Sequence, residues 1–260
     1  DDVLRHLAAP GGAKARSPAR ARESARRVGR LVPHSATRKQ IAEHMVRSLL
    51  QTAPHVTTVF EADLSAVLAH RARHRAEFER RGIPLTLTSY LLLAMVEAVR
   101  AVPESNARWT DAALEVFEYI DIGVATAVEN KGLIVPVVRD VHTLDLARVA
   151  RALGDLVTRA RSDKLTPADV RGGTLTISNH GVSGSVLAAP IVINQPQVAI
   201  VGVGKVEKRA VVVEEAGAER IVSRPRCFIS LTIDHRVMDG HRANHFLETL
   251  VRGLEGWPQG

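Results

Sequence analysis

Apolar residues recur every three or four positions in five stretches of the chain, and this spacing predicts helices. The stretches cover residues 37–53, 63–82, 88–102, 143–160 and about 240–254. Residues 88–102 are apolar nearly all round apart from Glu97 and Arg100, which predicts a helix buried in the core. The second half of the stretch at 63–82 is charged, so that helix is expected to keep one face in solvent.

Short runs of β-branched and apolar residues lie between these stretches and predict strands. The runs cover residues 56–61, 116–120, 122–128, 133–138, 173–179, 186–193, 197–203, 209–214, 219–223 and 227–234. Runs of strands interrupted by long helices are typical of a two-layer domain. The expected fold class is therefore α/β (α+β), with one large mixed sheet and flanking helices.

The net charge of +7 is concentrated in one part of the chain. Residues 1–30 hold eight basic and three acidic side chains, so they carry +5 and the remaining 230 residues carry only +2. Residues 8–30 are rich in Ala, Gly, Pro, Ser and Arg without apolar periodicity, which predicts a flexible basic linker before a folded body that begins near residue 31. The nearly neutral body and an aromatic content of 3% argue against nucleic-acid binding.

Several other classes of protein are disfavoured. The longest uncharged apolar stretch, residues 85–96, is too short to span a membrane. One cysteine, Cys227, rules out an internal disulfide framework and a cysteine-rich zinc site. His241 and His245 lie one helical turn apart, but Arg242 stands where a zinc protease needs glutamate, so no metal is expected.

A first candidate site residue lies where the last predicted strand ends. His235 follows that strand directly, and Asp239 and a glycine come four and five residues later. An imidazole held at a strand end next to a tight turn suits a general base. Its ordinary pKa, near 6.5, is close enough to that of a thiol, near 8.5, for proton transfer at neutral pH. The alternative is a surface histidine beside an Asp-Gly turn.

A second candidate lies at the end of the strand predicted at residues 173–179. Alternation places Thr174, Thr176 and Ser178 on one face of this strand. The strand then opens into a loop with Gly181 and Gly184, which lets main chain approach a ligand. A serine hydroxyl at such a position can donate to a developing oxyanion. The alternative is an ordinary exit from a strand into a loop.

Five segments in order carry a resemblance to one family: RKQIAEHMVRS at 38–48, TAPHVT at 52–57, KGLIVPVV at 131–138, the stretch from GGTLTISNHGVSGS to VAIVGVG at 172–204, and LTIDHRVMDG at 231–240. With them, residues 31–255 resemble the catalytic domain of the dihydrolipoyl acyltransferases, the core component of 2-oxoacid dehydrogenase complexes. The resemblance assigns residues 1–7 to the end of a peripheral-subunit-binding domain, 8–30 to a linker and 31–260 to the acyltransferase catalytic domain.

The resemblance implies a chloramphenicol acetyltransferase-like fold assembled as trimers, with trimers joined into a large hollow core. It implies an active site in a channel between subunits, with coenzyme A as substrate and a lipoyl group carried on a domain outside this chain. His235 matches the general base and Ser178 the oxyanion donor, from the adjacent subunit. Asp239 matches an aspartate that supports the site structurally. Implied partners are the lipoyl domain and the 2-oxoacid decarboxylase and dihydrolipoyl dehydrogenase components.

Residues 241–245 are bulkier and more polar than the alanine-rich run of many family members, so the subfamily stays open. The acyl group is acetyl, succinyl or a branched-chain acyl. Two alternative functions remain at this point: a chloramphenicol-type O-acetyltransferase, and a structural core protein without activity. The expected location is a bacterial cytoplasm, with the mitochondrial matrix as the alternative.

Overall fold

A computed structural model describes residues 31–128, 132–215 and 217–258 of the chain. The chain divides into two units, residues 1–36 and residues 37–260. The domain boundary and linker predicted for residues 1–7 and 8–30 lie outside the described residues. The second unit holds every segment predicted as a strand and all three candidate site residues, Ser178, His235 and Asp239.

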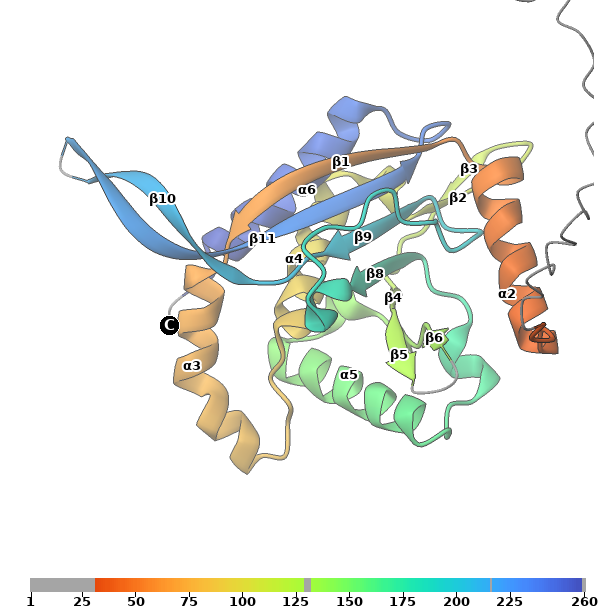
Figure 1. The fold of residues 1–260 in the computed structure, drawn as a ribbon, viewed down its shortest axis with the longest axis horizontal. Coiled ribbons are helices and arrows are strands. Elements are labelled where there is room, and N and C mark those ends of the chain that lie inside the picture. Colours follow the sequence, from red (N-terminus) through yellow and green to blue (C-terminus); the bar gives the residue numbers. More distant parts are fainter. Residues whose placement is uncertain (1–30, 129–131, 216, 259–260) are drawn as a thin grey trace, which may run out of the picture. The chain divides into compact units, whose positions relative to one another are not determined.

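A mixed sheet forms the centre of the second unit (Figure 1). Its strands follow the order β1-β11-β9-β8-β4-β7, and β10 pairs with the part of β11 that extends beyond the sheet. Their bounds are β1 His55–Asp63, β4 Ile122–Val124, β7 Val137–Val138, β8 Leu175–Asn179, β9 Ala199–Val203, β10 Glu207–Glu215 and β11 Ala218–Asp234. Strands β4, β8 and β9 run parallel, and the other pairs are antiparallel. The expected mixed α/β class is confirmed.

Helices pack against one face of this sheet and against one another. They are α3 Ser65–Arg80, α4 Leu87–Ala101, α5 Leu146–Arg161 and α6 Gly240–Glu255. A further helix, α2 Ala36–Val46, contributes no described side chain to the hydrophobic core and continues as a π-helical turn over Arg47–Thr52. The predicted core helix is confirmed, because α4 buries Leu91, Leu92 and Met95 completely. α6 lies against α4 and β1. Ile229, Leu231 and other apolar side chains of the sheet complete this core.

The opposite face of the sheet is polar and is covered by an irregular segment, residues 185–197, which we call the strap. Ser230, Thr232 and Asp234 point to this face and are 2% exposed or less. The Ser230 hydroxyl donates to the Ala188 carbonyl at 3.0 Å, and the Thr232 hydroxyl accepts from the main-chain N–H of Ile191 at 3.1 Å. Buried hydroxyls are therefore satisfied by the main chain of the strap.

The strand predicted at residues 186–193 is wrong, because these residues belong to the strap and form no ladder. Pro190 and Pro196 lack the N–H that a strand inside a sheet must donate. The main chain is instead hydrogen-bonded to side chains from distant parts of the sequence. The Ile193 carbonyl, for example, accepts from the Ser48 hydroxyl at 2.6 Å.

Five other predicted strands differ in detail. Residues 116–120 do not form one strand. Val116 ends the strand β3 Leu114–Val116, which pairs with β2 Ala107–Trp109 in a hairpin. The residues after it form no strand, and the Asn106 side chain donates to the carbonyls of Phe117 and Tyr119. The strands predicted at 219–223 and 227–234 are one continuous strand, β11. The predicted strands at 122–128 and 133–138 are each divided, and β5 Thr126–Val128 pairs with β6 Gly132–Ile134 as a separate hairpin.

The approach of the strap to the sheet requires glycine at one position, which yields a prediction on stability. A Cβ built on Gly204 would lie 1.9 Å from the Val186 carbonyl oxygen and 3.3 Å from that of Phe228. Both neighbours are main chain, and the Phe228 carbonyl also accepts the Gly204 N–H at 2.9 Å, so the added carbon would force the backbone to shift. We expect Gly204→Ala to lower the free energy of unfolding by about 2–3 kcal/mol. Gly240→Ala is the matched control, because a Cβ there meets nothing within 4 Å.

Denaturant titration of wild type and both variants measures this effect. A Gly204→Ala protein that unfolds at the wild-type denaturant concentration would contradict the close approach of the strap.

Candidate active site

His235 lies in the turn that directly follows β11, with its main chain fixed and its ring exposed. Its N–H donates to the Pro54 carbonyl at 2.9 Å, which ties the turn to the segment before β1. The N–H groups of Val237 and Met238 both donate to the Asp234 carbonyl, at 2.9 and 3.2 Å. The imidazole is therefore held at a defined place while it stays open to a reactant, as a general base requires.

Asp234 and Arg236, the two neighbours of His235, form an ion pair that the sequence analysis missed. Both carboxylate oxygens of Asp234 accept from the Arg236 guanidinium, the shortest bond being 2.6 Å, and Oδ1 also accepts the Arg236 main-chain N–H at 3.0 Å. The guanidinium lies 5.0 Å from the ring centre of Trp109. The pair raises the pKa of Arg236 and fixes the turn on both sides of His235.

Asp239 caps α6. Its carboxylate accepts the main-chain N–H of Arg242 at 2.9 Å and completes the first turn of the helix. This hydrogen bond is the main reason why the pKa of Asp239 is lowered, and the neighbouring His241 and His235 lower it further. The side chain is thus engaged in building the turn that carries His235.

The cap predicts how stability changes with pH. Because the pKa of Asp239 is lowered in the folded chain, its stabilising effect is complete above the ordinary aspartate pKa near 4 and is lost as the pH falls further. We expect Asp239→Ala to lower the melting temperature at pH 7 and to differ less and less from wild type as the pH falls below about 4. Asp239→Asn keeps the acceptor oxygen and serves as control. Equal melting temperatures for all three proteins at pH 7 would contradict the role of the cap.

Ser178 lies near the end of β8, on the polar face of the sheet, and is half-buried. It pairs with Gly202 of β9, which has no side chain to cover it. No described residue makes a hydrogen bond with the Ser178 hydroxyl, so the hydroxyl is free to donate to a bound group. The next residue, Asn179, points to the other face and bonds the Thr88 hydroxyl at 3.3 Å.

The structure brings His235 and Asp239 together but not His235 and Ser178. Ser178 pairs with Gly202, and Gly202 pairs with Ser230 of β11, four residues before the end of that strand. Two strand spacings of about 4.8 Å and four residues of about 3.3 Å place the α-carbons of Ser178 and Asp234 about 16 Å apart. β8 and β11 run in opposite directions (Figure 1). Because Ser178 is near the end of β8 and His235 directly follows β11, the two residues lie toward opposite ends of the sheet.

A cavity of about 630 Å³ lies beyond the end of β8, and Ser178 is not among the residues that line it. It is lined by Asn179 and Gly181 and by mostly apolar residues of α5 and of the start of α4. Arg161 at its rim makes no ion pair with a described residue. The cavity thus combines mostly apolar walls with one cation.

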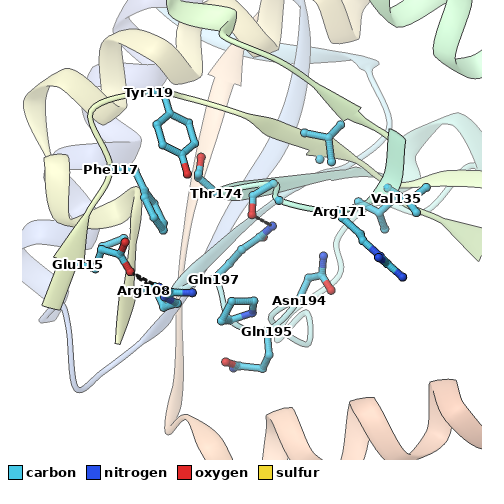
Figure 2. A pocket seen from close by; sticks show the side chains of 17 residues that line it. Arg108, Glu115, Phe117, Tyr119, Val135, Arg171, Thr174, Asn194, Gln195 and Gln197 are labelled. Carbon is cyan, nitrogen blue, oxygen red and sulfur yellow. Dashed lines mark hydrogen bonds and ion pairs between the residues drawn. The ribbon is translucent and has the colours of Figure 1, made fainter. Parts of the chain in front are cut away.

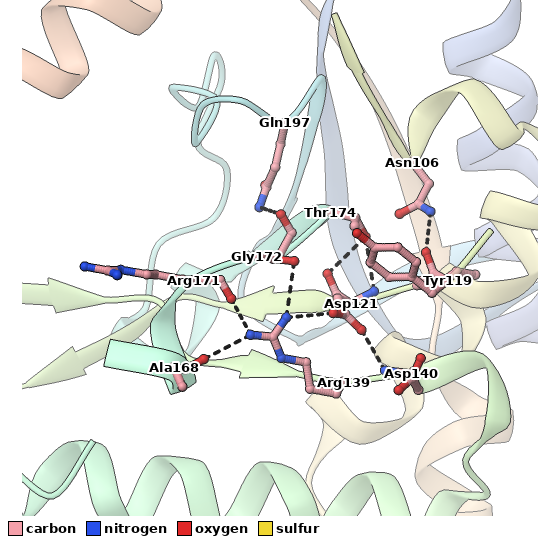
Figure 3. Close-up of polar contacts among 12 residues, drawn as sticks. Asn106, Tyr119, Asp121, Arg139, Asp140, Ala168, Arg171, Gly172, Thr174 and Gln197 are labelled. Carbon is pink, nitrogen blue, oxygen red and sulfur yellow. Dashed lines mark hydrogen bonds and ion pairs between the residues drawn. The ribbon is translucent and has the colours of Figure 1, made fainter. Parts of the chain in front are cut away.

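A second cavity, of about 440 Å³, lies at the opposite end of β8 and is polar (Figure 2). Arg108, Asn194 and Gln195 are among its lining residues, and Arg108 is paired with Glu115. Next to this cavity, Arg139 donates to Asp121 at 2.7 Å and to three main-chain carbonyls, which fixes the loop before β8 (Figure 3). The hydrogen bonds of Arg139 support the start of β8, and the second cavity is lined by none of the candidate residues Ser178, His235 and Asp239.

Residues 31–128, 132–215 and 217–258 contain no group of three or more His, Cys, Asp or Glu side chains that could hold a metal ion. In the same residues, no helix has the length and apolar character needed to cross a membrane.

Comparison with known proteins gives the family. A family model for the 2-oxoacid dehydrogenases acyltransferase (catalytic domain) matches residues 27–259. The succinyltransferase component of the 2-oxoglutarate dehydrogenase complex of Rickettsia bellii is 41% identical over 98% of this chain and 62% of the relative. The acetyltransferase component of the pyruvate dehydrogenase complex of Mycobacterium bovis is 38% identical over 84% of this chain and 40% of the relative.

Solved structures agree with this result. The dihydrolipoamide acetyltransferase of Azotobacter vinelandii, studied for the catalytic role of a serine, a histidine and an asparagine four residues after it, is 31% identical with a TM-score of 0.81. A structure of the cubic core of a pyruvate dehydrogenase complex has the same identity and score. In both cases the match covers 88% of this chain and 92% of the other. A chloramphenicol acetyltransferase, 17% identical over 85% of this chain and 96% of the other, shares the fold with a TM-score of 0.50.

The chain spans about three fifths of the length of the first curated relatives it matches. The match covers nearly all of this chain, and the family model covers the polar face, the His235 turn and β8 alike. The resemblance drawn from the sequence motifs is confirmed: this chain belongs to the family of 2-oxoacid dehydrogenase acyltransferases and contains their catalytic domain.

Proposed function

We propose that this chain transfers an acyl group between the thiol of a dihydrolipoyl group and coenzyme A. The observation that carries the proposal is the anchored, exposed imidazole of His235 at the end of β11. The imidazole takes the proton of the attacking thiol, and the thiolate adds to the carbonyl carbon of the acyl thioester. When the tetrahedral intermediate breaks down, the imidazolium returns the proton to the departing thiolate. One thioester is exchanged for another, so no net redox change occurs.

The oxyanion of the intermediate requires a donor, and the Ser178 hydroxyl of a second copy fits this role. Within one chain the two residues lie at opposite ends of the sheet, too far apart to act on one carbonyl group. A contact between the His235 end of one copy and the Ser178 end of the next is head-to-tail, and we propose that three copies joined in this way close into a ring. Trimers of this kind, joined into a larger core, agree with the cubic core among the related structures.

The apolar cavity beyond β8 supports the substrate assignment. Its volume of about 630 Å³ and apolar walls suit the pantetheine arm of coenzyme A or the hydrocarbon part of a lipoyl arm, and Arg161 can meet a phosphate. Exclusion of water from such a channel protects the thioester from hydrolysis. As core of a 2-oxoacid dehydrogenase complex, the assembly would receive lipoyl domains and carry the decarboxylase and dihydrolipoyl dehydrogenase components.

The test is an assay of purified protein with dihydrolipoamide and acetyl-, succinyl- or isobutyryl-coenzyme A, one donor at a time. We expect S-acyl-dihydrolipoamide from at least one donor, and an assembly whose mass is a multiple of three chains. Chloramphenicol replaces dihydrolipoamide in a control reaction. Acylation of chloramphenicol alone would favour the O-acetyltransferase alternative, and absence of every product from an assembled particle would favour a scaffold without activity.

A further inference from the structure

His180, two residues after Ser178, is half-buried, and both of its ring nitrogens are buried without a hydrogen-bond partner among the residues that the structure describes. Buried polar atoms are nearly always paired, so such an exception needs an explanation. His180 begins the short helical turn that leads from β8 to the strap. Burial lowers the pKa of His180, and the nearby main chain of Ser185 opposes part of this effect.

The ring lies beside Ser178. Ser178 lies on the polar face of the sheet and pairs with Gly202 of β9. A Cβ built on Gly202 would lie 3.4 Å from Nε2 of His180 and 2.4 Å from the Ser230 hydroxyl, so the His180 ring lies on the same face. The missing side chain of Gly202, whose main chain is one strand spacing of about 4.8 Å from that of Ser178, leaves room for this ring.

His55 shows what a histidine with a structural role looks like on the same face. Its Nδ1 lies 2.7 Å from the Ala53 carbonyl oxygen, and its Nε2 accepts the main-chain N–H of Ile193 at 3.0 Å. Both nitrogens are engaged, and the ring joins the strap to the start of β1. Neither ring nitrogen of His180 makes a bond of this geometry with a described residue.

We infer that His180 is a positioning residue for Ser178, donating a ring N–H to the serine oxygen so that the serine O–H points at the acyl oxygen. The inference rests on the proposed function of Ser178. Neither the His180 ring nor the Ser178 hydroxyl makes a hydrogen bond with a described residue. Both side chains can therefore rotate to form the His180–Ser178 hydrogen bond when the serine hydroxyl donates to the acyl oxygen. A neutral imidazole has one N–H to donate, and a donor behind the hydroxyl strengthens the bond in front of it.

The experiment is a double-mutant cycle at positions 178 and 180, measured as kcat and KM for acyl transfer per assembled trimer. The single variants are His180→Leu and Ser178→Ala, and the third protein carries both substitutions. His180→Gln places an amide N–H near the position of Nε2, and His180→Asn places it near Nδ1. His74→Leu is the matched control, because the Nε2 of His74 is also buried without a partner but lies on α3, away from the site.

We expect His180→Leu to lower kcat about tenfold with KM for the acyl donor unchanged, because the serine donor is retained but poorly aimed. Added to Ser178→Ala, the same substitution should change kcat less than about twofold. His180→Gln should restore most of the activity and His180→Asn should not. His74→Leu should leave kcat at the wild-type value.

Additive losses in the double variant would overturn the inference, as would a His180→Leu enzyme with wild-type kcat. If His180→Leu fails to assemble, the kcat values of His180→Gln and His180→Asn are compared instead. Equal kcat values for these two variants would overturn the inference. An enzyme in which Ser178→Ala has no effect would instead overturn the proposed role of Ser178, so the two failures can be distinguished.

Discussion

Replacement of His235 by alanine is expected to lower kcat for acyl transfer by a factor of about 10²–10⁴ while the particle still assembles. The loss follows because the imidazole is the general base for the thiol. Assembly is retained because the fold uses only the main chain of His235, through its bond to the Pro54 carbonyl, and leaves the ring exposed.

The matched control for this substitution is His245→Ala, a partly exposed histidine on α6 whose ring faces Glu248. Its kcat should equal that of wild type. Sizing chromatography and melting temperature of each variant separate a loss of catalysis from a loss of structure. A His235→Ala particle of normal size with wild-type turnover would refute the assignment of the base.

The second large effect is expected for Ser178→Ala, with a fall in kcat of about 10²–10³, the usual cost of one oxyanion donor. KM for the acyl donor should change little, because the hydroxyl acts on the charge of the intermediate rather than on the bound thioester. Stability should also be unchanged, since the hydroxyl makes no hydrogen bond with a described residue.

Ser223→Ala is the matched control. Ser223 is an exposed serine in the part of β11 that pairs with β10 and extends beyond the rest of the sheet. It should have wild-type kcat. A Ser178→Ala enzyme that raises KM and leaves kcat unchanged would show that the hydroxyl binds substrate instead of stabilising the oxyanion.

Apolar periodicity was sufficient to predict the helices, because α4, α5 and α6 each bury a face whose spacing is visible in the sequence. The start of α5 was less accurate. The residue that caps it is Asp145, not Thr143, and both are polar residues that suit a helix start. The strap could not be predicted, because its hydrogen bonds go to side chains of β1 and β11 that are distant in sequence.

The candidate site was predicted in part. His235 and Asp239 stood out because a strand end and an Asp-Gly pair are local signals. The ion pair of Asp234 with Arg236 could also have been suspected, because an acidic and a basic residue flank the histidine in the sequence. That Asp234 is buried, however, is visible only in the structure. The distance between His235 and Ser178 depends on the strand order β8-β9-β11, which no local pattern reveals.

The central claim is that His235 of one copy and Ser178 of another form one active site, and mixing of two inactive variants tests it most directly. His235→Ala and Ser178→Ala chains, unfolded, combined in equal amounts and refolded together, form mixed rings. In such rings about one quarter of the sites contain both intact residues, so activity should rise to about a quarter of wild type. The same variants refolded separately and then mixed serve as control. Co-refolded protein that assembles normally but stays as inactive as the separate variants would contradict the account, because both residues would then act within a single chain.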